Sequence, residues 1–185
     1  MTTTRSALGF WKTAALYGVP TGLLIICMMV GSMTFFGFHS GASAKAVGFL
    51  IMFVILSLIF FGIKRFRDID QGGVIKFSKA LLLGLSMSLF AGIAYVLIWE
   101  IYIGFTGDSF VIHYTDHLIA EKEAKGVSGE ALANFVTKME EMKANYAKPG
   151  FRIPLTFFEI FPMGFLITLF SALILHTPKF WARKG

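Results

Sequence analysis

Four long apolar stretches constrain this chain more than any other feature. They run over Ala14 to Phe38, Ala46 to Ile63, Leu81 to Phe105 and Ile153 to Leu175. A helix needs about 20 mostly apolar residues to cross a hydrocarbon core of about 30 Å, because each residue advances it by about 1.5 Å. Three stretches exceed that length, and Ala46 to Ile63 lies near its lower limit. The sequence therefore predicts an all-α integral membrane protein, a four-helix bundle in one membrane domain.

Composition and charge support this class and predict an orientation. Charged residues make up 15% of the chain, against about 25% in soluble domains. Of the 17 lysines and arginines, the ones that fall on one side of the predicted spans are Arg5, Lys12, Lys64, Arg65, Arg67, Lys76, Lys79, Lys179, Arg183 and Lys184. Because short basic segments stay in the cytoplasm, both termini are expected there. The net charge of +6 then faces anionic lipid, and no nucleic-acid partner is needed to explain it.

The segment between the third and fourth stretches, Thr106 to Arg152, is predicted to form two amphipathic helices outside the cytoplasm. The second helix has Ser128 as its expected N-cap, carries an apolar stripe, and is expected to stop at Lys148-Pro149-Gly150. The first covers Ser109 to Lys125 and ends at a glycine. We expect these helices to form an extracytoplasmic cap over the bundle or on the bilayer surface.

Small residues recur every fourth position in the third stretch, at Ala80, Gly84, Ser88 and Gly92. This spacing places them in one row on a helix, where they allow another backbone to approach closely. Gly18 and Gly22 repeat the pattern in the first stretch. Packing within one bundle is the expected role, and a dimerisation face is the alternative.

The connection between the second and third stretches is the densest charged segment of the chain. Its basic residues are expected to contact lipid phosphates, although they could also pair with Asp68 and Asp70. A Gly72-Gly73 pair is expected to turn the backbone. The expected lipid-phosphate contacts are Lys64, Arg65, Arg67, Lys76 and Lys79.

In the outer segment His113, Asp116, His117 and Glu121 share one helical face, as the ligands of a metal site would. Two histidines four residues apart supply only two nitrogen ligands, and no cysteine cluster completes a zinc site. We therefore expect no metal and no cofactor. His113, His117 and Glu121 are the ligands that a metal would use.

Two carboxylates, Glu100 and Glu159, fall near the outer ends of the third and fourth stretches. Ionisable groups at such positions are costly unless they are paired. Pairing with Arg152 or with a histidine of the cap would make them structural, whereas a shared site would handle ions or protons. Glu100, Glu159 and Arg152 are therefore the candidate polar site within the membrane.

Two segments resemble a known family. Phe60-Phe-Gly-Ile-Lys-Arg-Phe-Arg-Asp-Ile-Asp-Gln-Gly-Gly-Val-Ile-Lys-Phe-Ser-Lys-Ala80 and Leu155-Thr-Phe-Phe-Glu-Ile-Phe-Pro-Met-Gly-Phe-Leu-Ile-Thr-Leu-Phe-Ser-Ala-Leu-Ile-Leu175 are similar to the signature of a bacterial membrane family called domain of unknown function 4199. The resemblance implies a four-span protein of the bacterial inner membrane and implies no activity.

Together these features predict a non-enzymatic accessory or structural protein that binds membrane lipids, with another membrane protein or a second copy as further partners. The alternative is a small ion- or proton-coupled transporter or channel that uses Glu100 and Glu159. Against that alternative, the two halves run in the same sense, so the inverted repeat common in transporters is absent.

Overall fold

The computed structural model describes the backbone of residues 8–36 and 42–177 and the side chains of residues 8–33 and 46–177. All regular structure in these ranges is helical. The elements are α1 (Phe10–Phe36), α2 (Ala42–Leu56), α3 (Leu58–Arg65), the π-helical turn η1 (Phe66–Asp70), α4 (Phe77–Thr106), α5 (Ser109–Ala124), α6 (Gly129–Tyr146) and α7 (Pro149–Leu175).

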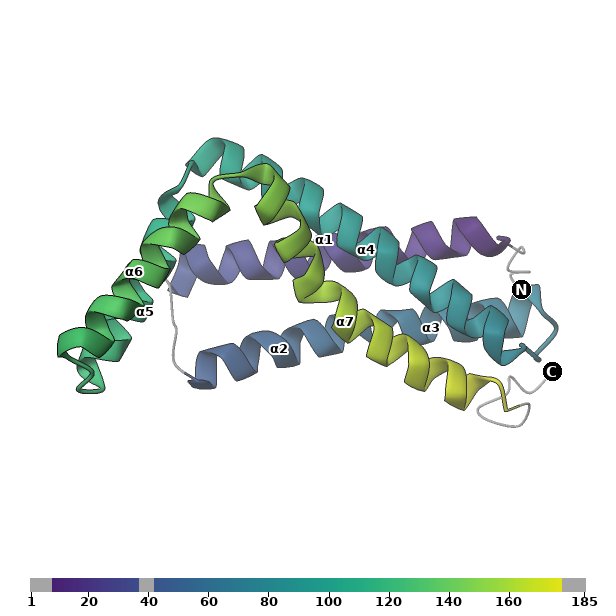
Figure 1. Ribbon diagram of the computed structural model, residues 1–185. Helices are drawn as coiled ribbons and strands as arrows, with labels where there is room; N and C mark the ends of the chain where they lie inside the picture. The colour runs from purple at the N-terminus through teal and green to yellow at the C-terminus, as the bar shows by residue number, and fades with distance from the viewer. Residues whose placement is uncertain (1–7, 37–41, 178–185) are drawn as a thin grey trace.

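Four segments of the described chain are long and apolar enough to cross a membrane. They are Phe10–Met33, Ala46–Asp70, Phe77–Thr106 and Pro149–Leu175. The all-helical class and the four apolar spans are therefore confirmed, and the chain has the character of a membrane protein. These four segments run alongside one another, and α5 and α6 form a hairpin at the end remote from the start of α1 (Figure 1).

Helix α4 is the centre of the packing, because its most extensive contacts are with α1 on one side and α7 on another. The close approach of α1 depends on two glycines. A Cβ atom added at Gly18 would lie 2.5 Å from the Met87 carbonyl oxygen, and one at Gly22 would meet the backbone of Ala91. Without side chains at these positions the two helices touch backbone to backbone, as small residues permit in membrane proteins.

The row of small residues on α4 packs against α7. A Cβ atom at Gly84 would lie 2.5 Å from Thr168 Cγ2, and one at Gly92 would lie 2.5 Å from the ring of Phe157. Between them the hydroxyl groups of Ser88 and Thr168 are 3.3 Å apart. The expected role of this row in packing within the chain is confirmed.

The second span is longer than the sequence predicted, since helical structure continues past Ile63 to Asp70. Its charges do not end the helix because they pair with one another, as when Lys64 Nζ contacts Asp68 Oδ2 at 2.7 Å. The turn comes at Gly72 and Gly73, whose φ angles of 66° and 93° favour glycine. Only the segment 71–76 is therefore left as a non-helical connection.

The fourth span also begins earlier than predicted. Pro149 starts α7 rather than only ending the preceding helix, because the first turn of a helix does not need the backbone N–H that proline lacks. Arg152 is therefore part of α7. In the outer segment, α5 and α6 match the two predicted helices, although Ser128 caps α6 by position without a side-chain hydrogen bond.

Candidate functional site

Arg152 and Glu100 form a bidentate ion pair between the start of α7 and the end of α4. Arg152 Nη2 donates to Glu100 Oε2 at 2.6 Å, and Nε donates to Oε1 at 2.7 Å. The third guanidinium nitrogen, Nη1, donates to the carbonyl oxygen of Tyr146 at 3.1 Å. Parallel hydrogen bonds of this kind are strong and geometrically specific. This pair therefore joins α4, α6 and α7 and leaves Glu100 engaged.

Tyr146, at the end of α6, links the same region to the core. Its hydroxyl accepts a hydrogen bond from Trp99 Nε1 at 2.8 Å, and the Arg152 guanidinium lies over its ring, 5.8 Å from the centroid. Burial raises the pKa of Tyr146 to about 12, so the phenol stays protonated at neutral pH. The hairpin of α5 and α6 is thus held to the spans by interlocking polar and aromatic contacts.

Glu159 lies about 10 Å further along α7 than Arg152, as the rise of a helix requires for seven residues. Among the side chains that the structure describes, no cation forms an ion pair with it. Tyr95 on α4 lines the same cavity as Glu159, and its hydroxyl donates to Met29 Sδ at 2.7 Å. The predicted polar layer is therefore divided: Arg152 is paired with Glu100, and Glu159 lies deeper with Tyr95.

A cavity of about 620 Å³ adjoins Glu159 and is bounded by α1, α2, α4 and α7. Its volume falls within the roughly 300–1,000 Å³ typical of small-molecule sites. Glu159, Tyr95 and Ser32 are its polar members. The remaining lining residues are glycine and apolar side chains: Ile25, Met28, Met29, Gly48, Phe49, Ile51, Met52, Phe158, Ile160, Pro162, Met163 and Leu166.

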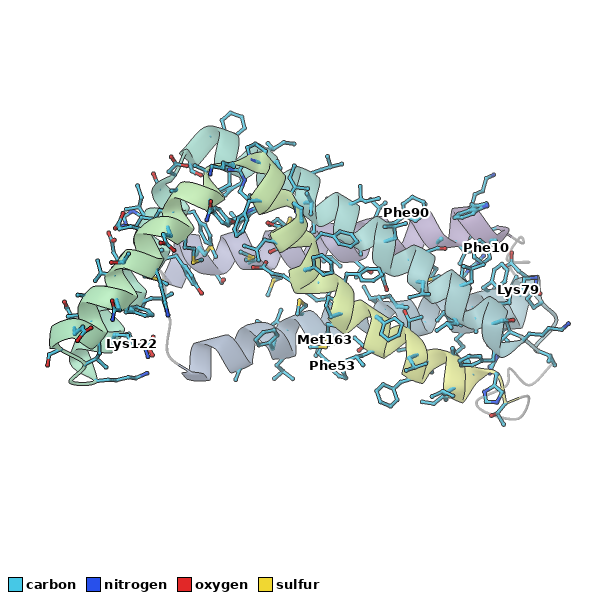
Figure 2. The ribbon with its side chains drawn as sticks, in the orientation of Figure 1. Phe10, Phe53, Lys79, Phe90, Lys122 and Met163 are labelled. Atoms are coloured by element: carbon cyan, nitrogen blue, oxygen red, sulfur yellow. The ribbon has the colours of Figure 1, made fainter. Side chains whose placement is uncertain are left out.

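Helix α2 and the methionines give this cavity its shape. Gly48 lines it and has no atom within 4 Å of the position that a Cβ would take, so the absence of a side chain leaves room. Figure 2 shows Met163 of α7 in the region where α7 passes α2. Flexible thioether side chains can adapt to occupants of irregular shape.

The rim of the cavity is apolar. Met28, Phe49, Phe158 and Leu166 all line it, and their exposed fractions lie between 47% for Leu166 and 65% for Phe158. In a spanning segment such exposed apolar side chains face lipid. The cavity therefore opens among exposed apolar side chains.

The charged cluster at the other end of the spans ties helix ends together. The Asp70 carboxylate accepts hydrogen bonds from the backbone N–H groups of Leu8 and Gly9, at 2.8 and 2.7 Å, where α1 begins. Arg67 Nη1 donates to the carbonyl oxygen of Leu175, the last residue of α7, at 3.4 Å. An acid at a helix N-terminus and a base at a C-terminus both complement the helix dipole.

This arrangement corrects one expected lipid contact. Arg67 is 0% exposed and pairs with Asp68 at 2.7 Å, so it cannot reach a lipid phosphate. Lys64 and Arg65 are paired with Asp68 and Asp70. Lys76 and Lys79 remain on the surface, and Lys79 Nζ also lies 5.7 Å from the ring centroid of Phe66.

The structure does not bring His113, His117 and Glu121 together as a metal site. Within residues 8–36 and 42–177, no group of three or more histidine, cysteine, aspartate or glutamate side chains is placed to hold a metal ion. Glu121 pairs with Lys125 at 2.6 Å, and Asp116 on the same helix pairs with Lys143 of α6 at 3.0 Å. His113 and His117 lie on α5, in the hairpin.

Comparisons with known proteins locate the chain in a family without adding an activity. The family described as "Protein of unknown function (DUF4199)" matches residues 16–177. No curated protein matches the chain, and no solved structure matches it.

Proposed function

Since this chain belongs to the DUF4199 family, whose description assigns no activity, we propose a function from its own geometry. It is a non-enzymatic, multi-pass membrane protein that binds a lipid-like molecule in the cavity between α1, α2, α4 and α7. The observation that carries this proposal is the cavity itself, about 620 Å³ in volume, mostly apolar, and open through an apolar rim. A few polar groups in an apolar pocket are typical of a ligand site.

The proposal is tested by photolabelling in lipid nanodiscs with an alkyl alcohol that carries a diazirine. Labelling is expected to be saturable and to concentrate on cavity residues such as Met52 and Met163. Gly48→Phe adds a ring at a lining position where no atom lies within 4 Å of the added Cβ, and it should weaken apparent binding by about tenfold or more. Gly31→Phe is the matched control, because Gly31 also has free space around it and does not line the cavity. Labelling that does not saturate, or that Gly48→Phe leaves unchanged, would refute the proposal.

We also propose that the protein lies in a bacterial inner membrane with both termini and the connection 71–76 in the cytoplasm, and with the α5–α6 hairpin outside as a cap. The basic residues near the ends of α1, α3 and α7 support this orientation. On a Cys27→Ala background, a membrane-impermeant thiol reagent added outside should modify Ser128→Cys and spare Ser78→Cys. Both serines are exposed, so access to the reagent depends on the side of the membrane. The opposite pattern would invert the topology.

An ion- or proton-coupled transporter is the second candidate, and the observation that favours it is the carboxylate of Glu159 without an ion pair in the described structure. The engagement of Glu100 by Arg152 removes the second carboxylate from such a site. Ion or proton flux in liposomes that is lost in Glu159→Gln, with no saturable lipid labelling, would favour this candidate over lipid binding.

A further inference from the structure

The strongest chemical asymmetry of the cavity is one carboxylate in an apolar lining. Glu159 contributes an acid, whereas Tyr95 and Ser32 contribute only neutral hydroxyl groups. Arg152, on the same helix as Glu159, does not supply a counter-charge. Its guanidinium already donates to the Glu100 carboxylate and to the carbonyl oxygen of Tyr146. A charge in such surroundings is costly unless a counter-charge accompanies it.

We propose that the occupant of the cavity is a lipophilic amine, a hydrocarbon body with one protonated amino group, whose ammonium binds Glu159. The inference rests on the proposed lipid-binding function and assigns its ligand class. An ammonium group supplies both the counter-charge and several hydrogen-bond donors. A charge-assisted hydrogen bond to the carboxylate is about twice as strong as one between neutral groups.

The geometry also separates the two ends of such a ligand. Glu159 and Tyr95 lie together where α4 faces α7, while Met52 and Phe49 line the cavity from α2. The ammonium would therefore lie against α7 and α4, and the hydrocarbon would lie between α1 and α2 and reach the apolar rim. A soluble cation would fill little of the apolar volume, which favours an amine attached to hydrocarbon.

The same carboxylate selects against other membrane molecules. A fatty acid or an anionic lipid would bring a second negative charge toward Glu159, and repulsion in a low-dielectric site is strong. An uncharged alcohol would fit the apolar lining and supply no counter-charge for an ionised Glu159. Specificity of this kind comes from rejecting competitors as much as from binding the preferred ligand.

The test compares diazirine-bearing alkyl amine, alcohol and carboxylic acid probes of equal chain length, with the full chain in nanodiscs of uncharged lipid. In the unmodified protein the amine is expected to label the cavity at a concentration at least about tenfold lower than the alcohol, a difference of 1.4 kcal/mol. The acid should bind most weakly. This comparison needs no variant and therefore does not depend on one that folds.

Variants then assign the preference to one residue. Glu159→Gln should abolish the difference between amine and alcohol while alcohol labelling is retained, and Gly48→Phe should reduce labelling by both.

Equal binding of amine and alcohol in the unmodified protein would overturn the inference while leaving lipid binding intact. Loss of saturable labelling by every probe would instead refute the proposed function. Displacement of the amine by ammonium chloride at similar concentration would overturn the requirement for hydrocarbon.

Discussion

Replacing Arg67 with methionine is expected to lower the free energy of unfolding by about 3 kcal/mol, because it removes a fully buried charge from its partners. Breaking a buried pair typically costs about 3–5 kcal/mol, and the lower end applies here because Lys64 still pairs with Asp68. The lost contacts are the ion pair with Asp68 and the hydrogen bond to the carbonyl oxygen of Leu175. Unfolding in mixed micelles, followed by the fluorescence of buried Trp99, measures the change.

Lys76→Met is the control for this experiment, since Lys76 is an exposed basic residue of the same connection. It should alter stability by less than about 0.5 kcal/mol, as surface substitutions usually do. Arg67→Lys keeps the charge and loses the planar guanidinium, so its free energy of unfolding should lie between those of Arg67→Met and Lys76→Met. Equal stability of Arg67→Met and Lys76→Met would show that the cluster contributes nothing to the fold.

Replacing Gly22 with leucine is expected to cost about 3 kcal/mol or more, because the added side chain would drive α1 away from α4. Its Cβ atom would meet the carbonyl oxygen of Ala91 and lie 2.9 Å from the carbonyl carbon. Backbone atoms cannot turn aside as a flexible side chain can. A lower melting temperature in detergent, together with greater exposure of Trp99 to a fluorescence quencher, would register the separation of the helices.

Gly31→Leu provides the matched comparison on the same helix, since no atom lies within 4 Å of the added Cβ position. It should leave the melting temperature nearly unchanged. If Gly22→Leu and Gly31→Leu behaved alike, the close contact of α1 with α4 would not contribute to stability.

The four spans and the small-residue row were predictable because both follow from local patterns. Hydropathy over about 20 residues reports a crossing helix directly, and a spacing of four residues reports one helical face. Span ends were predicted less well. The helices extend through Arg67 and Arg152 because distant or neighbouring acids neutralise them, and no hydropathy pattern shows which charges will meet.

The candidate site was predictable only in part, for a related reason. Glu159 stood out as an acid in an apolar stretch, but its neighbour Tyr95 lies on another helix, and no pattern along the sequence brings the two together. The cavity is lined by residues from four helices, α1, α2, α4 and α7. Empty volume is a property of how helices are placed relative to one another, and periodicity along one helix does not report it.

The cluster around η1 has a consequence for the order in which the protein is made. Asp70 caps the start of α1, so the first helix receives its N-terminal cap only after two spans have been synthesised. Arg67 contacts the carbonyl oxygen of Leu175, which is the last residue of the fourth span to be translated. Until then its guanidinium lacks one of its native acceptors. In a nascent chain interrupted before the end of α7, Arg67 would therefore lack the acceptor that joins η1 to the end of the fourth span.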